Sequence, residues 1–509
     1  MAPRPEPDPT PALATTESIV VERPSPPRVR APLARAGSVA RRISGAVGAV
    51  ATGPDRSGAL MPLTGLRWIA ALYIVLLHTG IGATARALAS EQPTTGTGAV
   101  ARAALEFLGR VGTFGYVATG FFLVLGGYAL AIGYLDRTTG TFRRDPRAFW
   151  RSRFVRFVPL LLLTQALRIP QYLMRERGAP WTEVATSLGV HLMGLQAWFP
   201  EHVSDLNYPA WTMTLLFATW AVFPWLGPRL ARRSARELIL ALVACQLYAL
   251  ATAIILPTLD AAPAAAGQMA TWRVALYTHP LVRGVDILSG ILLACLHRRQ
   301  GAAARRLAPA LLVASIATLL GACAASGTGV PVDIARNGLL LAPTLALLVA
   351  LVEYAGMRHA GPRGWLSGQV DRLGGAIVAA LTRPRILRCA EVSFTLYLVH
   401  AVPMSVLSAA RHLVAGRPLV FSGDPFPAHA LELPLSIAYL IGITLLSFWV
   451  HRRLTIPLQH WATNRLSTLD AAGPPTQAAA AAPAKHQPTT SPVERIDRAS
   501  RLHTGEHVA

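Results

Sequence analysis

The sequence predicts an all-α fold: a polytopic membrane bundle of about ten transmembrane helices, with disordered N- and C-terminal tails. Hydrophobic residues make up 52% of the 509 residues and charged residues only 15%, and the mean hydropathy is +0.40. A soluble chain of this length normally carries more charge. Apolar stretches of about 18 to 22 residues recur along the chain, and a helix needs this length to cross a bilayer.

Three parts follow one another along the chain. Residues 1–55 are rich in Pro, Ala and Arg and lack the apolar run of a signal peptide, so we expect a disordered cytoplasmic arm. Residues 56–467 hold the transmembrane domain, and residues 468–509 are expected to form a disordered cytoplasmic tail. The expected spans are 62–80, 111–133, 154–173, 209–228, 237–256, 280–297, 306–324, 336–356, 391–411 and 432–451.

The distribution of arginine decides the expected topology. The arginine-rich connecting segments are 134–153, 229–236, 298–306, 358–388 and 451–453. A further apolar stretch, 185–199, contains His191 and is short for a span. If it does not cross, every arginine-rich segment lies on one side with both termini, and the positive-inside rule identifies that side as the cytoplasm. We therefore predict a multi-pass protein of the cell (plasma) membrane with both termini cytoplasmic and 185–199 re-entrant or interfacial on the outer side.

The net charge of +22 comes almost entirely from arginine, because Lys485 is the only lysine. The arginines lie in short loops and in the tails, so the charge indicates topology and a lipid bilayer as partner, not nucleic acid. The four cysteines lie in or beside apolar segments and form no CxxC pair. They are expected to be small core residues, and no metal site is predicted.

The first span carries Arg67 and His78, and ionisable residues at membrane depth are costly and often functional. Eleven residues at 100° each overshoot three turns by about 20°, so both side chains share one helix face, about 16 Å apart along the axis. The pattern predicts a fixed cation near one membrane surface and a titratable imidazole deeper in. A snorkelling arginine with a packed histidine explains the spacing equally well.

A second pattern lies at 149–159, where Arg151, Arg153 and Arg156 enter the start of the third span. Arg153 and Arg156 are i, i+3 neighbours on one face. Guanidinium groups near a helix N-terminus can bind phosphates, so this segment could hold a polyphosphate such as the nucleotide of coenzyme A. Ordinary positive-inside anchoring is the alternative, and the charge count alone favours it.

Two other patterns favour a structural role. The second span is rich in glycine from Gly112 to Gly127, and small residues let membrane helices approach closely. A glycine-lined face that admits a thin pantetheine arm is the weaker alternative. Arg283 and Asp286 are i, i+3 neighbours inside a span, where opposite charges usually pair.

The late span contains Ser393, Tyr397 and His400, which fall on one helix face at i, i+4 and i+7. These side chains are polar enough to line a site. A buried network in which every hydrogen bond is satisfied explains them equally well.

Together these stretches resemble the acyltransferase-3 family of membrane acyltransferases over residues 61–457. The segment 63–78 resembles the family's opening Leu-Asp-Gly-Leu-Arg-Gly-Ile-Ala-Ala element, in which ten residues separate the arginine from a following histidine. The other matching elements, in the family's order, are 121–128, 149–159, 207–224 and 393–400. Some positions depart from the family's usual residues: Thr64 stands for Asp, Gly126 for Ser, and Leu216 and Thr455 for Glu.

The resemblance implies transfer of an acyl group, most simply acetyl, from acyl-coenzyme A to a hydroxyl of a carbohydrate or glycosylated acceptor. Acyl-coenzyme A would be a co-substrate, and no permanently bound cofactor is expected. His78 would act as general base, since imidazole titrates near neutrality, and Arg67 would position the donor or the intermediate. The expected binding residues are Arg151, Arg153 and Arg156 for the nucleotide phosphates, and Trp211, Ser393, Tyr397 and His400 for the acceptor.

Two other classes of function remain open from the sequence. Intramembrane Arg, His and Asp would also suit a transporter or flippase of a polar or lipid-linked substrate, although no inverted repeat is visible. A catalytically weak scaffold that acts through its tails would explain the departures at Leu216 and Thr455.

Overall fold

The computed structural model describes residues 57–259, 271–325, 338–357, 365–414 and 433–471. Within these ranges the chain is helical, apart from short connections and one isolated antiparallel bridge between Leu135 and Phe142. The all-α prediction is therefore confirmed. The predicted arm 1–55 lies outside the described residues, as does nearly all of the predicted tail.

Eight segments in the described ranges are long and apolar enough to cross a membrane. They are Leu60–His78, Gly96–Tyr134, Tyr208–Ala231, Ala235–Leu256, Thr271–Arg299, Gly301–Ala325, Ser393–Ala410 and Pro434–Leu466. Each overlaps one of the expected spans. The chain is thus a multi-pass membrane protein.

The remaining two expected spans are also helices. Helix α14 (Leu341–Gly356) has 16 residues and is about 24 Å long, less than the roughly 30 Å of a bilayer core. Helix α6 (Pro146–Arg175) has 30 residues, but Gln165, Arg168 and Gln171 interrupt its apolar stretch. Most residues of α14 are buried, whereas α6 buries Gln165 and Arg168 but leaves Leu162 and Leu167 exposed.

The centre of the bundle is the packing of α5 (Val117–Tyr134) against α11 (Pro280–Arg299). A Cβ atom built on Gly127 would lie 1.9 Å from the carbonyl oxygen of Ile287, and one on Gly290 would lie 2.0 Å from that of Val124. Only glycine allows this approach of the two backbones. For Gly127, the predicted structural role is confirmed.

Several arginine-rich segments meet on one side of the molecule. Arg298 donates hydrogen bonds to the carbonyl oxygens of Ala131 (2.8 Å) and Leu135 (2.9 Å). Arg299 donates to the carbonyl oxygen of Ala231 (2.9 Å). These hydrogen bonds join the arginine-rich segment 298–306 directly to 134–153 and to 229–236, as expected if all three lie on the same side of the membrane.

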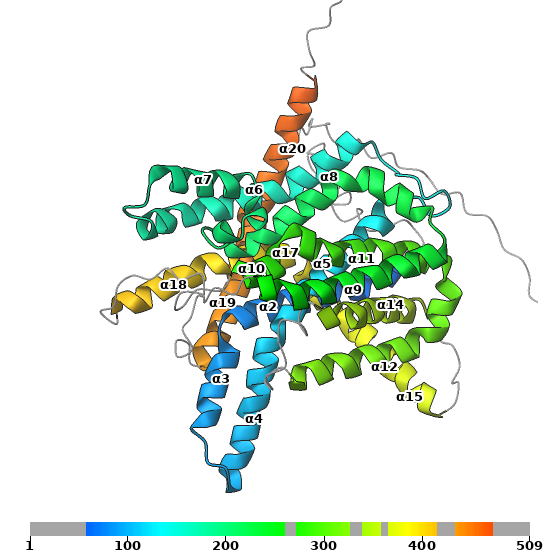
Figure 1. The fold of residues 1–509 in the computed structure, drawn as a ribbon, viewed down its shortest axis with the longest axis horizontal. Coiled ribbons are helices and arrows are strands. Elements are labelled where there is room, and N and C mark those ends of the chain that lie inside the picture. The colour runs from blue at the N-terminus through cyan, green and yellow to red at the C-terminus, as the bar shows by residue number, and fades with distance from the viewer. Residues whose placement is uncertain (1–56, 260–270, 326–337, 358–364, 415–432, 472–509) are drawn as a thin grey trace, which may run out of the picture.

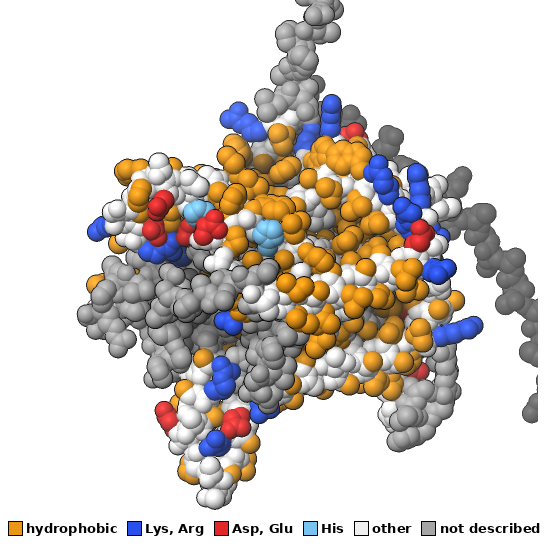
Figure 2. All heavy atoms as spheres, viewed as in Figure 1, with side chains coloured by type: hydrophobic (Ala, Val, Ile, Leu, Met, Phe, Trp, Pro, Cys, Tyr) orange, Lys and Arg blue, Asp and Glu red, His pale blue; other side chains and the backbone are white. Residues whose placement is uncertain are grey.

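The apolar surface suits a lipid environment. Figure 2 shows hydrophobic side chains over the central helices of the visible face, with arginines along the rim. On α9 (Ala235–Leu259), the exposed large hydrophobic residues include Ile239, Leu240, Val243, Leu247, Ile254 and Ile255. In water such a continuous patch would be strongly unfavourable, whereas lipid accommodates it.

The remaining described elements complete the bundle and extend from it (Figure 1). The hairpin of α3 (Ile81–Ser90) and α4 (Gly96–Thr113) projects away from the body, and η2 (Phe114–Tyr116) links α4 to α5. The others are α8 (Trp211–Ala231), α10 (Thr271–Thr278), α12 (Gly301–Ala325), α15 (Trp365–Leu381), α16 (Pro384–Ala390), α17 (Ser393–Val399), α18 (Ala401–Val414), α19 (Leu433–Val450), η7 (His451–Thr455) and α20 (Ile456–Ala471). Helix α20 runs a few residues into the predicted tail.

The stretch expected to be re-entrant begins with α7 (Trp181–Leu192). Its 12 residues extend about 18 Å, too short to cross a bilayer. The 3₁₀ turns η3 (Gln196–Trp198), η4 (Pro200–His202) and η5 (Tyr208–Ala210) then lead into α8. This segment delivers Tyr208 to the site described below.

Candidate active site

Helix α2 (Ser57–His78) carries both ionisable residues of the first span. It ends directly after His78, because Gly80 adopts the left-handed conformation (φ 71°) that stops the helix. Arg67 lies three turns earlier and donates to the carbonyl oxygen of Ala390 (3.1 Å). The helix therefore holds the two side chains at separate levels of the bundle, about 16 Å apart along its axis.

The imidazole of His78 pairs with a second imidazole. Its Nδ1 lies 3.0 Å from Nε2 of His400, and the two rings are nearly parallel, with an interplanar angle of 11°. Tyr208 meets His78 edge to face at 4.9 Å between ring centroids, and its hydroxyl lies 3.4 Å from Nε2 of His400. His78 is half-buried, whereas His400 is fully buried. We refer to His78, His400 and Tyr208 as the histidine site.

Several contacts fix His400. Its Nδ1 lies 2.7 Å from the carbonyl oxygen of Tyr397, and its own carbonyl oxygen accepts from the hydroxyl of Tyr439. Asn207 and Tyr397 also tie the 3₁₀ turn η5 to α17: the Asn207 amide donates to the carbonyl oxygen of Leu398 (3.0 Å), and the Tyr397 hydroxyl donates to that of Pro209 (3.0 Å). These crossed bonds hold the segment that carries Tyr208 against the segment that carries His400.

A cluster of cations lies around Arg67, near the middle of α2. Arg156 is close enough to Arg67 and to Arg153 for their charges to interact, and all three side chains are half-buried. We refer to Arg67, Arg153 and Arg156 as the arginine cluster. Among the described residues, no carboxylate pairs with these guanidinium groups, and the Nε atoms of Arg67 and Arg153 are buried without a hydrogen-bond acceptor. Uncompensated cations of this kind favour an anionic ligand.

The start of α6 positions two of these arginines. Asp145 caps the helix by accepting from the amide of Ala148 (2.9 Å), and Pro146 occupies the first turn. The Arg153 guanidinium lies over aromatic rings, at 4.9 Å from Tyr134, 5.6 Å from Phe149 and 5.8 Å from Trp220. Such stacking fixes the plane of the guanidinium.

Arg151 occupies a different environment. Its side chain is exposed, whereas Arg153 and Arg156 are half-buried on another face of the same helix. Its expected contact with phosphate remains a prediction.

The turn η7 and helix α20 add two residues to this region that were not predicted as part of a site: His451, which lies in the arginine-rich segment 451–453, and Gln459. The π-helical turn η7 turns His451 toward Thr395, with 3.1 Å between Nδ1 and the hydroxyl oxygen, and near the charge of Arg156. Gln459 donates to the carbonyl oxygen of Arg156 (2.9 Å). Between them, the Thr455 hydroxyl is buried with no partner among the described residues. Sequence periodicity gives no sign of a π-turn, so this arrangement could not be predicted.

Three residues expected to contact the acceptor are deeply buried. The Ser393 hydroxyl donates to the carbonyl oxygen of Ala390 (2.8 Å), and the Tyr397 hydroxyl donates as described above. Trp211 begins α8 next to the turn that carries Tyr208 and is 8% exposed. For Ser393 and Tyr397, these bonds match the alternative of a satisfied internal network, and their contact with an acceptor remains a prediction.

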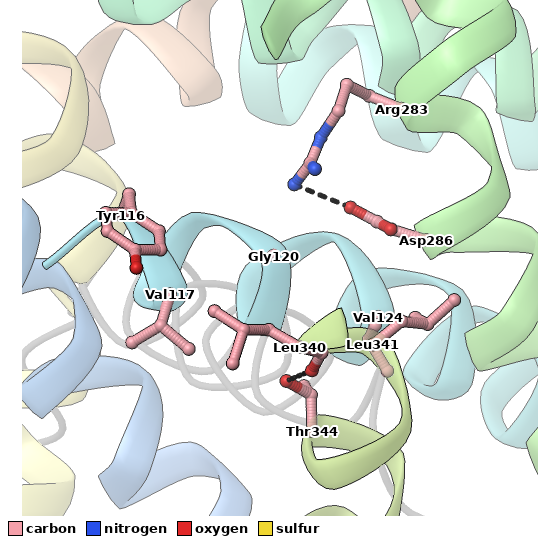
Figure 3. Close-up of a pocket in the computed structure, with 9 residues that line it drawn as sticks. All are labelled: Tyr116, Val117, Gly120, Val124, Arg283, Asp286, Leu340, Leu341 and Thr344. Carbon is pink, nitrogen blue, oxygen red and sulfur yellow. Dashed lines mark hydrogen bonds and ion pairs between the residues drawn. The ribbon is translucent and has the colours of Figure 1, made fainter. Parts of the chain in front are cut away.

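The expected ion pair is confirmed, and it borders a small cavity. Arg283 Nη2 lies 2.7 Å from Asp286 Oδ2, and both side chains are buried. Figure 3 shows the pair on one side of the cavity, with Tyr116 and Thr344 also lining it. Its volume of about 20 Å³ is sufficient for about one water molecule. The cavity is too small for an acyl donor or a sugar.

The structure contains a second buried polar network, which the sequence did not predict. His297 links the hydroxyl of Tyr128 (2.7 Å from Nδ1) to the carboxylate of Glu353 (2.5 Å from Nε2), and Arg305 approaches the other carboxylate oxygen at 3.4 Å. It joins α5, α11, α12 and α14. Its members lie far apart in sequence, and only Tyr128 falls in a motif that the sequence analysis used.

Most of the chain matches a known protein family. A family model described as an acyltransferase domain, that of the acyltransferase-3 family, matches residues 63–452. The chain belongs to the acyltransferase-3 family. The match includes the histidine site and the arginine cluster. Acyltransferase MdmB of Streptomyces mycarofaciens is 31% identical over 183 residues, which are 35% of this chain and 42% of that protein. The alignment therefore spans less than half of that relative, and no solved structure matches the chain.

Two departures from the usual acyltransferase-3 residues are neighbours in space. A Cβ built on Gly126 would lie 4.0 Å from a terminal methyl of Leu216. Where the family commonly has Ser and Glu, this chain therefore has a glycine facing an apolar side chain.

Proposed function

We propose that this acyltransferase-3 member is an integral membrane O-acyltransferase. It transfers an acyl group, most simply acetyl, from acyl-coenzyme A to a hydroxyl of a carbohydrate or glycosylated acceptor. It lies in the cell membrane with both termini in the cytoplasm. The observation that carries the proposal is that helix α2 joins a histidine that can act as a base, His78, to a cluster of cations without a carboxylate partner among the described residues, through Arg67.

The chemistry requires one proton acceptor and one place for negative charge. As the acceptor oxygen attacks the thioester carbonyl, its proton passes to His78. A C–O bond forms, the C–S bond breaks, and the coenzyme A thiolate recovers the proton from His78. The products are an ester and coenzyme A, so the histidine returns to its starting state.

The arginine cluster supports the choice of donor. Three guanidinium groups without a carboxylate among the described residues suit several phosphate oxygens better than one carboxylate. The separation of about 16 Å between Arg67 and His78 requires a long donor whose charged end and reacting end are far apart. An acyl group on a pantetheine arm attached to a nucleotide meets this requirement.

The grouping of the arginine-rich segments supports the proposed membrane orientation. Arg298 and Arg299 donate hydrogen bonds to the connections on the proposed cytoplasmic side. With this orientation, the arginine cluster faces the compartment that contains acyl-coenzyme A. His78 then lies deeper in the bundle, toward the outer half.

The test uses the purified full-length protein in nanodiscs with radiolabelled acetyl-coenzyme A and a panel of glycans and glycosylated small molecules. We expect transfer of the label to an acceptor hydroxyl by the wild type and none by His78→Ala at equal protein level. Mass spectrometry of the product identifies the group that was added. Transfer by His78→Ala at the wild-type rate would exclude His78 as the base, and transport of an unmodified substrate into vesicles would favour a transporter.

A further inference from the structure

We infer that His400 is a positioning residue that selects the tautomer of His78 in which Nε2 can accept the substrate proton. This inference rests on the proposed function and refines it. It depends on two consecutive contacts: the backbone carbonyl of Tyr397 contacts one nitrogen of the His400 imidazole, and the other nitrogen of that ring contacts His78.

The carbonyl oxygen of Tyr397 decides the first proton. It lies 2.7 Å from Nδ1 of His400, and a carbonyl can only accept a hydrogen bond. Nδ1 of His400 must therefore carry hydrogen. In a neutral imidazole the other nitrogen, Nε2, then has a lone pair and is an acceptor.

The second proton follows from the first. Nε2 of His400 lies 3.0 Å from Nδ1 of His78, and two lone pairs cannot face each other at that distance. Nδ1 of His78 must carry hydrogen, and the lone pair of His78 is on Nε2. Among the described residues, Nε2 of His78 makes no hydrogen bond, so it is available to a substrate hydroxyl.

The alternative is a doubly protonated His400 that donates to both neighbours. Its side chain is fully buried, and no carboxylate among the described residues contacts it. A buried imidazolium without a counter-ion is strongly unfavourable, so the neutral form is favoured. The Tyr208 hydroxyl, 3.4 Å from Nε2 of His400, is compatible with this form as a second and longer donor.

The arrangement also assists the reaction. When His78 takes up the substrate proton, its Nδ1–H becomes a stronger donor, and the lone pair of His400 is already aligned to accept it. In this chain a second histidine therefore does what a buried carboxylate does in a Ser-His-Asp triad, which is to orient the imidazole and stabilise its charged form.

Two substitutions at His400 separate positioning from packing. His400→Leu removes the acceptor, whereas His400→Gln can place an amide oxygen near the former position of Nε2. We expect kcat to fall about 100- to 10,000-fold in His400→Leu, with KM for acyl-coenzyme A unchanged. His400→Gln should recover at least a tenth of the wild-type kcat.

Nuclear magnetic resonance of protein labelled with ¹⁵N-histidine reports the tautomer directly. At neutral pH we expect His78 to be protonated at Nδ1 and unprotonated at Nε2 in the wild type and in His400→Gln, and to become a mixture of tautomers in His400→Leu. A wild-type signal with Nε2 protonated would overturn the inference, as would near wild-type kcat in folded His400→Leu while His78→Ala is inactive. Activity in His78→Ala would instead contradict the proposed function.

Discussion

Replacing Arg153 tests whether the arginine cluster binds the phosphates of the donor. Its guanidinium is stacked over three aromatic rings, and its Nε is buried with no acceptor among the described residues. In Arg153→Lys the positive charge remains, but the planar fork and the ring stacking are lost. If one charge-assisted hydrogen bond to phosphate is lost, the cost is about 1.5 to 3 kcal/mol. This energy corresponds to a rise in KM for acyl-coenzyme A of roughly 10- to 150-fold.

The assay compares two donors at fixed acceptor concentration: acyl-coenzyme A and an acyl-pantetheine that lacks the nucleotide. Arg153→Lys should raise KM for the first and leave the kinetics of the second unchanged, because the lost contact is with phosphate. Arg147→Gln is the matched control, since it removes a charge from an exposed position on the same helix. The reasoning would be refuted by an unchanged KM, or by an equal loss with both donors.

Three further predictions concern stability. Gly127→Ala should lower the melting temperature markedly because its methyl group would overlap a backbone carbonyl of α11, whereas Gly284→Ala, with nothing within 4 Å of the added Cβ, should not. Glu353→Ala breaks a buried pair and should cost about 3 to 5 kcal/mol, and the exposed Glu183→Ala should change thermal unfolding little. Burial lowers the pKa of His191, on α7 outside the membrane-spanning segments, to about 4. The unfolded chain therefore binds more protons between about pH 4 and 6.5, so stability should decrease by up to about 3 kcal/mol as pH falls through that window. His191→Gln should flatten this dependence, and an equally steep profile would contradict its assignment to His191.

Much of the architecture could be predicted because a bilayer imposes simple rules on length and polarity. Apolar stretches of sufficient length predicted the positions of the helices. The grouping of arginines predicted that several connecting segments lie on one side, and hydrogen bonds from Arg298 and Arg299 join three of those segments. The shared face of Arg67 and His78 follows from helix geometry alone.

The partners across the bundle could not be predicted in this way. The contact between His78 and His400 joins residues 322 positions apart, and nothing local in either segment specifies it. The link from His297 to Glu353 is of the same kind, and the π-turn at His451 depends on a local change of helix register. Periodicity identifies the face of a helix, whereas the neighbour on that face depends on packing.

The most direct test of the account is a structure of the full chain in lipid with a non-hydrolysable acyl-coenzyme A analogue. The account predicts phosphate oxygens within hydrogen-bonding distance of Arg153 and Arg156, and the acyl carbonyl next to Nε2 of His78. A nucleotide bound away from these arginines, or an acyl group that does not reach the histidine site, would contradict it.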